Sequence, residues 1–193
     1  MKICVYGAAS PKIEKKYIEE VEKLGLMMAG RGHELVFGAG ENGLMGAAAR
    51  GVKRGGGRIH GIIPAFFRDE NVEAIYPLCD ELTFTKDMRE RKQLLEDSSD
   101  AFIIVPGGIG TFEEFFEVLT LKQLGRHSKP IVIFNIDGYY DDLIAVLTGA
   151  EEKGFINENC LKLYGCTADA AEALRLVEEH RDESLNVRDL KDG

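Results

Sequence analysis

The sequence predicts an α/β fold in which helices cover both faces of a mostly parallel sheet. Short runs rich in β-branched residues alternate with longer amphipathic segments along the chain, a pattern typical of parallel strands joined by crossover helices. A length of 193 residues, 45% of them hydrophobic, is enough for one well-buried domain and short for two. We therefore expect a single-domain, doubly wound, Rossmann-like fold over residues 1–180, followed by a charged tail over residues 181–193.

The apolar runs predict strands, in chain order, at residues 2–6, 34–37, 59–63, 81–84, 101–105, 131–135 and 161–164. Segments with apolar residues at helical spacing predict helices at residues 13–30, 43–54, 87–98, 112–124, 140–153 and 168–180. The stretch between Pro64 and Pro77 is irregular. With Phe66 and Phe67 it is interpreted either as a lid or pocket wall or as a packed connection.

Composition and charge exclude several classes of function. A net charge of −9 and an isoelectric point near 5.0 argue against a nucleic-acid polymer as partner, which would require a basic surface. The four cysteines form no C-x-x-C pair and the four histidines lack ligand spacing, so we expect no metal site. No signal peptide precedes the first strand, and no apolar run approaches the ~20 residues that span a bilayer. We expect a cytoplasmic protein that binds no membrane.

The glycine-rich turn PGGIG, residues 106–110, predicts a binding site for an anion. It lies between a predicted strand and a helical pattern that begins at Phe112. Gly107, Gly108 and Gly110 allow the backbone to approach a ligand and to turn its N–H groups toward one point. The positive end of the dipole of the following helix adds to the attraction for an anion.

Glu114 follows this turn, and the sequence leaves two interpretations of it open. In the first, its carboxylate lies beside the bound anion, where a simple phosphate cradle has no need of an acid. In the second, Thr111 and Glu114 form a T-x-x-E capping box, in which each side chain bonds the backbone amide of the other. A T-x-x-E pattern alone is more often a cap than a catalytic pair, so the first interpretation needs a second element.

MRERK at residues 88–92 supplies that element. At 3.6 residues per turn, Met88, Arg91, Lys92 and Leu95 share one stripe of a helix. A buried cation is costly unless an anion accompanies it, either a carboxylate of the protein or a phosphate of a ligand; alternatively, the long stems only snorkel. Combined with the glycine-rich turn, the stripe favours a phosphate.

Glycines also follow the first two predicted strands, in YGAAS at residues 6–10 and GAGENGLMG at residues 38–46. Turns after parallel strands converge at the carboxyl edge of a sheet, where ligands bind, so three such turns indicate a nucleotide-sized ligand. Residues 38–43 satisfy the bare pattern G-x-G-x-x-G, but they follow the second strand and lack the acidic residue of a dinucleotide site. We expect no dinucleotide cofactor.

Together these motifs resemble the Lonely Guy (LOG) family of cytokinin-activating nucleoside 5′-monophosphate phosphoribohydrolases, long labelled lysine decarboxylases. The resemblance covers nearly the whole chain. PGGIGTFEE at residues 106–114 is similar to the PGGxGTxxE motif of the family, and MRERK to its M-x-x-RK element. Further similarities are GLMG (43–46), EVLT (117–120), QLG (123–125) and DGYY (137–140). Occurring together in this order, the elements are specific to the family, whereas no single one of them is.

The resemblance implies hydrolysis of the N-glycosidic bond of an adenine-type nucleotide, either a cytokinin riboside 5′-monophosphate or AMP, to free base and ribose 5-phosphate. It implies that Arg91 and Glu114 are catalytic, with Glu114 beside the ribose. There a carboxylate would stabilise an oxocarbenium-like transition state more than the neutral ground state and would orient or activate water. Arg91 would keep that carboxylate ionised. The positions implied to hold substrate and its phosphate are Met88, Lys92, Gly107, Gly108, Gly110, Thr111 and Thr120. The resemblance also implies a homodimer that needs no metal and no organic cofactor.

The chain departs from the plant members of the family at three places. Arg89 stands where they have the histidine of M-H-x-RK, and the second turn reads GAGEN where theirs is closer to GGGSI. Ala8 and Ala9 stand near positions usually held by glycine and serine. The phosphate and carboxylate elements are retained, while the choice between a prenylated adenine nucleotide and AMP stays open.

Three other interpretations fit parts of the sequence. A non-catalytic nucleotide-binding sensor or carrier on the same fold would retain the glycine-rich turn and use Glu114 only as a cap. A pyridoxal-phosphate decarboxylase, as in the old family label, would need a lysine placed for a Schiff base, and we find none. A purely structural assembly protein would not explain Arg91 and Lys92 on an apolar stripe. We therefore predict a phosphoribohydrolase.

Overall fold

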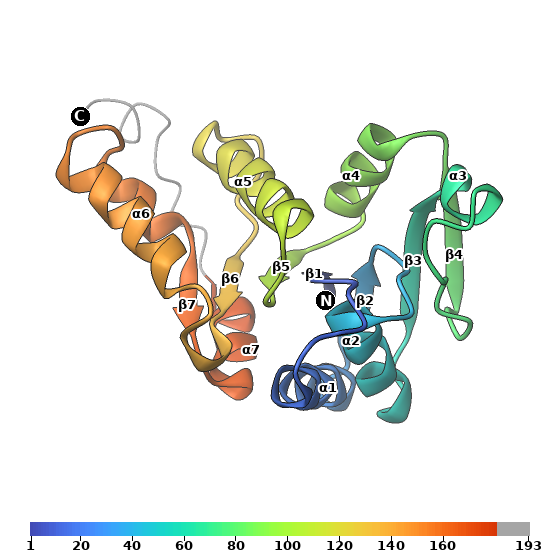
Figure 1. The fold of residues 1–193 in the computed structure, drawn as a ribbon. Helices are drawn as coiled ribbons and strands as arrows, with labels where there is room; N and C mark the ends of the chain where they lie inside the picture. The colour runs from blue at the N-terminus through green and yellow to red at the C-terminus, as the bar shows by residue number, and fades with distance from the viewer. Residues whose placement is uncertain (181–193) are drawn as a thin grey trace.

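The computed structural model describes residues 1–180, which form one parallel sheet between two layers of helices (Figure 1). The predicted tail, residues 181–193, lies outside the described residues. The strands are β1 (Lys2–Tyr6), β2 (Glu34–Phe37), β3 (Ile59–Pro64), β4 (Glu81–Thr85), β5 (Ala101–Ile104), β6 (Ile131–Phe134) and β7 (Gly165–Thr167). They pair in the order β4-β3-β2-β1-β5-β6-β7, and every neighbouring pair is parallel. The predicted doubly wound α/β fold is confirmed.

The α-helices are α1 (Lys15–Gly30), α2 (Gly43–Arg54), α3 (Ala65–Asp69), α4 (Met88–Asp97), α5 (Ile109–Gln123), α6 (Asp141–Glu152) and α7 (Ala170–Glu178), with 3-10 helices η1 (Ile136–Gly138) and η2 (Glu158–Leu163). α1, α2 and α7 cover one face of the sheet, and α4, α5 and α6 cover the other (Figure 1). Along β1, Ile3 and Val5 pack into the first layer while Cys4 and Tyr6 pack into the second. Because both faces are covered, the central strands are apolar throughout.

The order of the strands creates a crevice at the centre of the sheet. From β1 the chain builds outward through β2 and β3 to β4, and it then returns to place β5 on the other side of β1. The connection after β1 leads to α1 on one face, whereas the connection after β5 leads to α5 on the opposite face. The two loops therefore diverge at the carboxyl ends of adjacent strands, where open α/β sheets bind ligands.

The last predicted strand, residues 161–164, is wrong. The strand β7 begins only at Gly165, and the preceding residues form η2. Cys160 and Leu163 are both buried, three positions apart, which matches a 3-10 helix rather than the alternation of a strand. The apolar run was thus an inward-facing helical turn.

The irregular stretch after β3 is a packed connection, one of its two predicted interpretations. It begins with the short helix α3, which the sequence did not predict. Farther along, Ile75 forms an antiparallel bridge with Gly40, and the amide of Glu41 donates to the carbonyl of Ala74 at 2.8 Å. These bonds attach the stretch to the second glycine turn, after β2, and so bring it to the carboxyl edge of the sheet.

Candidate active site

The glycine-rich turn leads from β5 directly into α5, which begins at Ile109, three residues earlier than predicted. Gly108 is the N-cap, and no side chain caps this end of the helix. Thr111 therefore lies inside the first helical turn, 3% exposed, and folds back so that a Cβ at Gly107 would lie 2.1 Å from its Oγ1. The capping box of Thr111 and Glu114 does not form, so that interpretation of Glu114 is wrong.

The carbonyl groups of the turn are hydrogen-bonded within the protein, whereas its amide groups are left open to a ligand. Four successive carbonyls, from Val105 to Gly108, accept hydrogen bonds from the hydroxyl of Tyr140 (2.8 Å), the amide of Ala8 (3.1 Å), the hydroxyl of Tyr139 (2.6 Å) and the amide of Phe112 (3.0 Å). The amides of residues 108–111 have no acceptor within the described part of the chain. Open amides at a helix N-terminus attract anions, so the predicted anion site has its donors in place.

Arg91 lies beside this turn because α4 places it on a buried face. Asp87 caps α4 by accepting from two amides of its first turn, at 3.0 and 2.9 Å. Arg91 is 7% exposed; its Nε donates to the carbonyl of Ile62 at 3.3 Å, and its Nη1 lies 3.5 Å from Oε1 of Glu114. Its Nη2 rests against Gly38, where a Cβ would stand only 1.9 Å away. The glycine after β2 thus provides room for the guanidinium.

The carboxyl of Glu114 is buried opposite Arg91. Burial raises its pKa to about 7, and the positive charge of Arg91 only partly opposes this rise. The expectation that Arg91 favours the ionised form of Glu114 agrees in direction with its effect on the pKa, although burial outweighs it. A carboxyl that titrates near neutral pH in a crevice is suited to exchange protons with a substrate or water.

Lys92 and Met88 lie on the same helix as Arg91 but make different contacts. The Nζ of Lys92 forms ion pairs with Glu113 and, at 2.9 Å, with Glu117. The sequence left open whether a basic residue here would meet a protein carboxylate or a ligand phosphate, and the contacts of Lys92 are with carboxylates. The sulfur of Met88 lies 4.0 Å from Nη1 of Arg91, so Met88 borders the buried pair.

Of the remaining predicted positions, Gly108 and Gly110 lie at the open end of the turn. A Cβ at either one would meet no atom within 4 Å, so this side is accessible to a ligand. Thr120 is exposed on α5, six residues beyond Glu114, which is about 9 Å farther along the helix axis. The structure brings the turn, Arg91 and Glu114 together and leaves Thr120 apart.

Glu73 is a further acid at this site that the sequence did not predict. Its Oε1 is buried and has no hydrogen-bond partner among the described residues, and it lies 2.2 Å from where a Cβ of Gly40 would stand. Burial raises the pKa of its carboxyl, and Arg91 opposes the rise. The bridge between Ile75 and Gly40 attaches the segment of Glu73 to the turn after β2, and no local sequence pattern predicts such a bridge.

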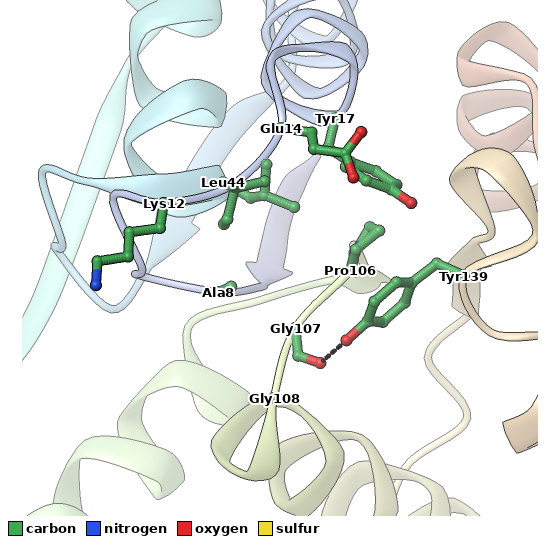
Figure 2. A pocket seen from close by; sticks show the side chains of 10 residues that line it. Ala8, Lys12, Glu14, Tyr17, Leu44, Pro106, Gly107, Gly108 and Tyr139 are labelled. Atoms are coloured by element: carbon green, nitrogen blue, oxygen red, sulfur yellow. Dashed lines mark hydrogen bonds between the residues drawn. The ribbon is translucent and has the colours of Figure 1, made fainter.

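A pocket of about 350 Å³ adjoins the turn on the side of α1. Figure 2 shows it between the β1–α1 loop, the start of α2 and the turn itself. Its walls include Ala8, Tyr17, Leu44 and Tyr139, together with Gly107 of the turn. The ring of Tyr139 meets that of Tyr17 edge to face, with centroids 6.2 Å apart. Arg91 and Glu114 do not line this pocket, so the turn has a hollow on one side and the buried ion pair on the other.

Comparison with known proteins identifies the family. Residues 45–177 match a family described as "Possible lysine decarboxylase". The chain is 37% identical over 179 residues to the probable cytokinin riboside 5′-monophosphate phosphoribohydrolase LOGL1 of Oryza sativa subsp. japonica. The aligned residues cover 93% of this chain and 79% of that protein. It is 35% identical over 182 residues to the cytokinin riboside 5′-monophosphate phosphoribohydrolase LOG7 of Arabidopsis thaliana, covering 94% and 83%. The chain belongs to the LOG family. It is thus a member of a family of enzymes.

The same fold occurs in proteins that carry other names. The Moco carrier protein from Chlamydomonas reinhardtii superposes with a TM-score of 0.69 over 92% of this chain and 95% of that chain, at 24% identity. The molybdenum cofactor binding protein from Rippkaea orientalis gives 0.67 over 92% and 93%, at 21% identity. At such identities the likeness concerns the fold alone. It supports the doubly wound arrangement and carries no information about the chemistry of this LOG-family chain.

Two features are absent from the described residues of this LOG-family chain. Residues 1–180 contain no group of three or more histidine, cysteine, aspartate or glutamate side chains placed to hold a metal ion. Within the same residues, none of the helices has the length and apolar character to cross a membrane.

Replacing Glu114 by Gln should change how stability depends on pH. The folded carboxyl has a pKa of about 7, against an ordinary value of 4.5, so the folded state binds the proton more tightly than the unfolded state. As pH rises through this window, ionisation of the buried wild-type carboxyl lowers the free energy of unfolding, and the loss is complete above about pH 7. Glu114→Gln lacks this loss, so its stability relative to wild type should rise by up to about 3 kcal/mol between about pH 4.5 and pH 8.

Urea unfolding of both proteins at a series of pH values measures this difference. The matched control is Glu152→Gln, which removes an exposed carboxylate at the end of α6. A difference for Glu114→Gln that stays constant with pH, or that follows the control, would contradict the raised pKa.

Proposed function

We propose that this chain hydrolyses the N-glycosidic bond of an adenine-type nucleoside 5′-monophosphate and releases free base and ribose 5-phosphate. The observation that carries the proposal is the buried pair of Arg91 and Glu114 beside a turn whose amides are open. A site that only held phosphate would not need a buried carboxyl next to the anion. The names of the relatives, all phosphoribohydrolases of cytokinin riboside 5′-monophosphate, support the same reaction.

In the proposed reaction the turn holds the 5′-phosphate. The amides of Gly108, Gly110 and Thr111 would donate to its oxygens, and the positive end of the α5 dipole would add to the attraction. Gly107 is required because Thr111 occupies the space of a side chain there. The phosphate then fixes the nucleotide with its ribose near Glu114.

At the ribose, we propose that Glu114 first stabilises positive charge and then acts as a general base. As the glycosidic bond breaks, positive charge develops on the sugar, and an ionised carboxylate stabilises that charge. Water adds its oxygen to the anomeric carbon and keeps one proton as the new hydroxyl; its other proton passes to Glu114, which returns it, directly or through solvent, to the departing base. Arg91 holds the carboxylate from the other side at 3.5 Å. No step of this reaction requires a metal or an organic cofactor.

Contacts support the other proposed substrate residues to different degrees. Met88 borders Arg91, which supports a contact with the substrate. Lys92 is engaged by two carboxylates of α5, which supports a role in holding α4 against α5 more directly than a contact with phosphate. Thr120 keeps its proposed role only by resemblance to the family.

We further propose that the chain is a cytoplasmic homodimer. Large apolar side chains are exposed on α5 and α6, with Ile109 86%, Phe116 38% and Val146 65% exposed, and a second copy of the chain would cover them. Light scattering of the purified protein tests this, and a mass of one chain at micromolar concentration would contradict it. The cytoplasmic location remains a prediction from the sequence.

Glu114→Gln should lower kcat by about a hundredfold or more, because an amide can neither carry the negative charge nor accept the proton. Nucleotide binding should be retained. Chromatography of incubations with AMP and with isopentenyladenosine 5′-monophosphate measures free base and ribose 5-phosphate, and the ratio between the two substrates addresses base preference.

In this assay Glu152→Gln, which removes an exposed carboxylate of α6, should keep its turnover. Equal turnover in Glu114→Gln and wild type would remove Glu114 from the mechanism. Nucleotide that binds wild type without release of base would instead favour a sensor or carrier.

Gly38→Ala should impair turnover by displacing Arg91. The new Cβ would lie 1.9 Å from Nη2 of Arg91, and because this is the end of a flexible side chain, the guanidinium moves while the fold survives. We expect kcat to fall by about tenfold or more, since small misplacements of catalytic groups are costly. Gly149→Ala is the control, at a glycine of α6 where a Cβ meets nothing within 4 Å. Turnover of Gly38→Ala equal to that of the control would exclude a catalytic role for Arg91.

A further inference from the structure

The segment after β6 delivers two tyrosines to the glycine-rich turn. Asp137 and Gly138 have φ values of 55° and 70°, a left-handed bend that turns the chain back from the end of β6. Tyr140, 1% exposed, places its hydroxyl on the carbonyl of Val105 at 2.8 Å. Tyr139, 42% exposed, places its hydroxyl on the carbonyl of Gly107 at 2.6 Å (Figure 2).

The bond from Tyr139 determines how the next amide is aimed. The carbonyl of Gly107 and the N–H of Gly108 belong to one peptide group, and no peptide bond among the described residues is cis. In a planar trans peptide these two groups point in opposite directions. Holding the carbonyl at Tyr139 therefore directs the N–H of Gly108 away from Tyr139, toward the open side of the turn.

This peptide is also the one that most needs an external constraint. It joins two glycines, which lack the side chains that restrict backbone rotation. If it rotated by half a turn, it would present its carbonyl oxygen where its N–H had been. At an anion site that exchange replaces attraction by repulsion, so a free Gly107–Gly108 peptide would weaken the site it belongs to.

We propose that Tyr139 is a positioning residue, whose hydroxyl holds the Gly107–Gly108 peptide with its amide facing the 5′-phosphate. The inference rests on the proposed function in one respect, that the anion in the turn is the phosphate of the substrate. Tyr139 does not touch the reacting atoms; it acts through the turn. Its effect is therefore specific for ligands that carry a phosphate.

Tyr139→Phe removes the hydroxyl and keeps the ring that lines the pocket. We expect the affinities for ribose 5-phosphate and AMP to fall about tenfold, the scale of one hydrogen bond, and KM for AMP to rise with kcat little changed. The affinity for adenosine, which lacks the phosphate, should not change. Tyr17→Phe is the matched control, because Tyr17 lines the same pocket and its hydroxyl makes no bond to the turn in the described structure; it should bind all three ligands as wild type does.

Titration calorimetry with ribose 5-phosphate, AMP and adenosine, alongside steady-state kinetics, decides the matter. Unchanged affinity of Tyr139→Phe for ribose 5-phosphate overturns the proposal, and so does an equal loss for adenosine, which would indicate a merely structural role. Wild type that binds ribose 5-phosphate but cleaves neither AMP nor isopentenyladenosine 5′-monophosphate would refute the proposed hydrolysis and leave the role of Tyr139 to be judged by binding. Wild type that does not bind ribose 5-phosphate would overturn both the phosphate role of the turn and the role of Tyr139.

Discussion

The guanidinium of Arg91 and the carboxyl of Glu114 lie 3.5 Å apart, with their side chains 9% and 10% exposed. Removing two such groups from water costs several kcal/mol each, and their attraction offsets this only in part, because burial still raises the pKa of Glu114 to about 7. The surrounding structure must therefore hold α4 and α5 at the spacing that makes the pair. Lys92, which joins α4 to two carboxylates of α5, contributes to that spacing from the solvent side. A buried carboxyl with a raised pKa is typical of functional sites.

In the turn beside the pair, the carbonyl groups and the amide groups have opposite roles. Its carbonyls are bound by the protein, two of them by tyrosines from a distant segment, and its amides are left for a ligand. Backbone amides without partners at a helix N-terminus are normally satisfied by caps or water. The absence of a capping side chain leaves room for an anion at this helix end, since a serine or aspartate at Gly108 would occupy its place.

Local patterns predicted the elements well and their ends less well. β-branched runs predicted the strands β1 to β6, and helical spacing placed Arg91 on the apolar stripe of its helix. The start of α5 was misplaced because T-x-x-E fits both a helix cap and the interior of a first turn, and glycine at the N-cap gives no contrary signal. Glu73 and Tyr139 were missed for a different reason. Tyr139 bonds a carbonyl far away in the chain, and Glu73 is brought to the site by the bridge between Ile75 and Gly40; neither contact leaves a trace in the local sequence.

The charges of the crevice explain how a raised pKa can serve the proposed hydrolysis. In the ground state the ribose is neutral and the phosphate is anionic, so the substrate does not oppose the burial that raises the pKa of both nearby acids, Glu114 and Glu73, and shifts their preference toward the protonated form. As the glycosidic bond breaks, positive charge on the sugar shifts that preference, and the ionised form of Glu114 becomes the favoured one. The attraction thus grows from ground state to transition state, which is the condition for an interaction to raise kcat rather than only to tighten binding.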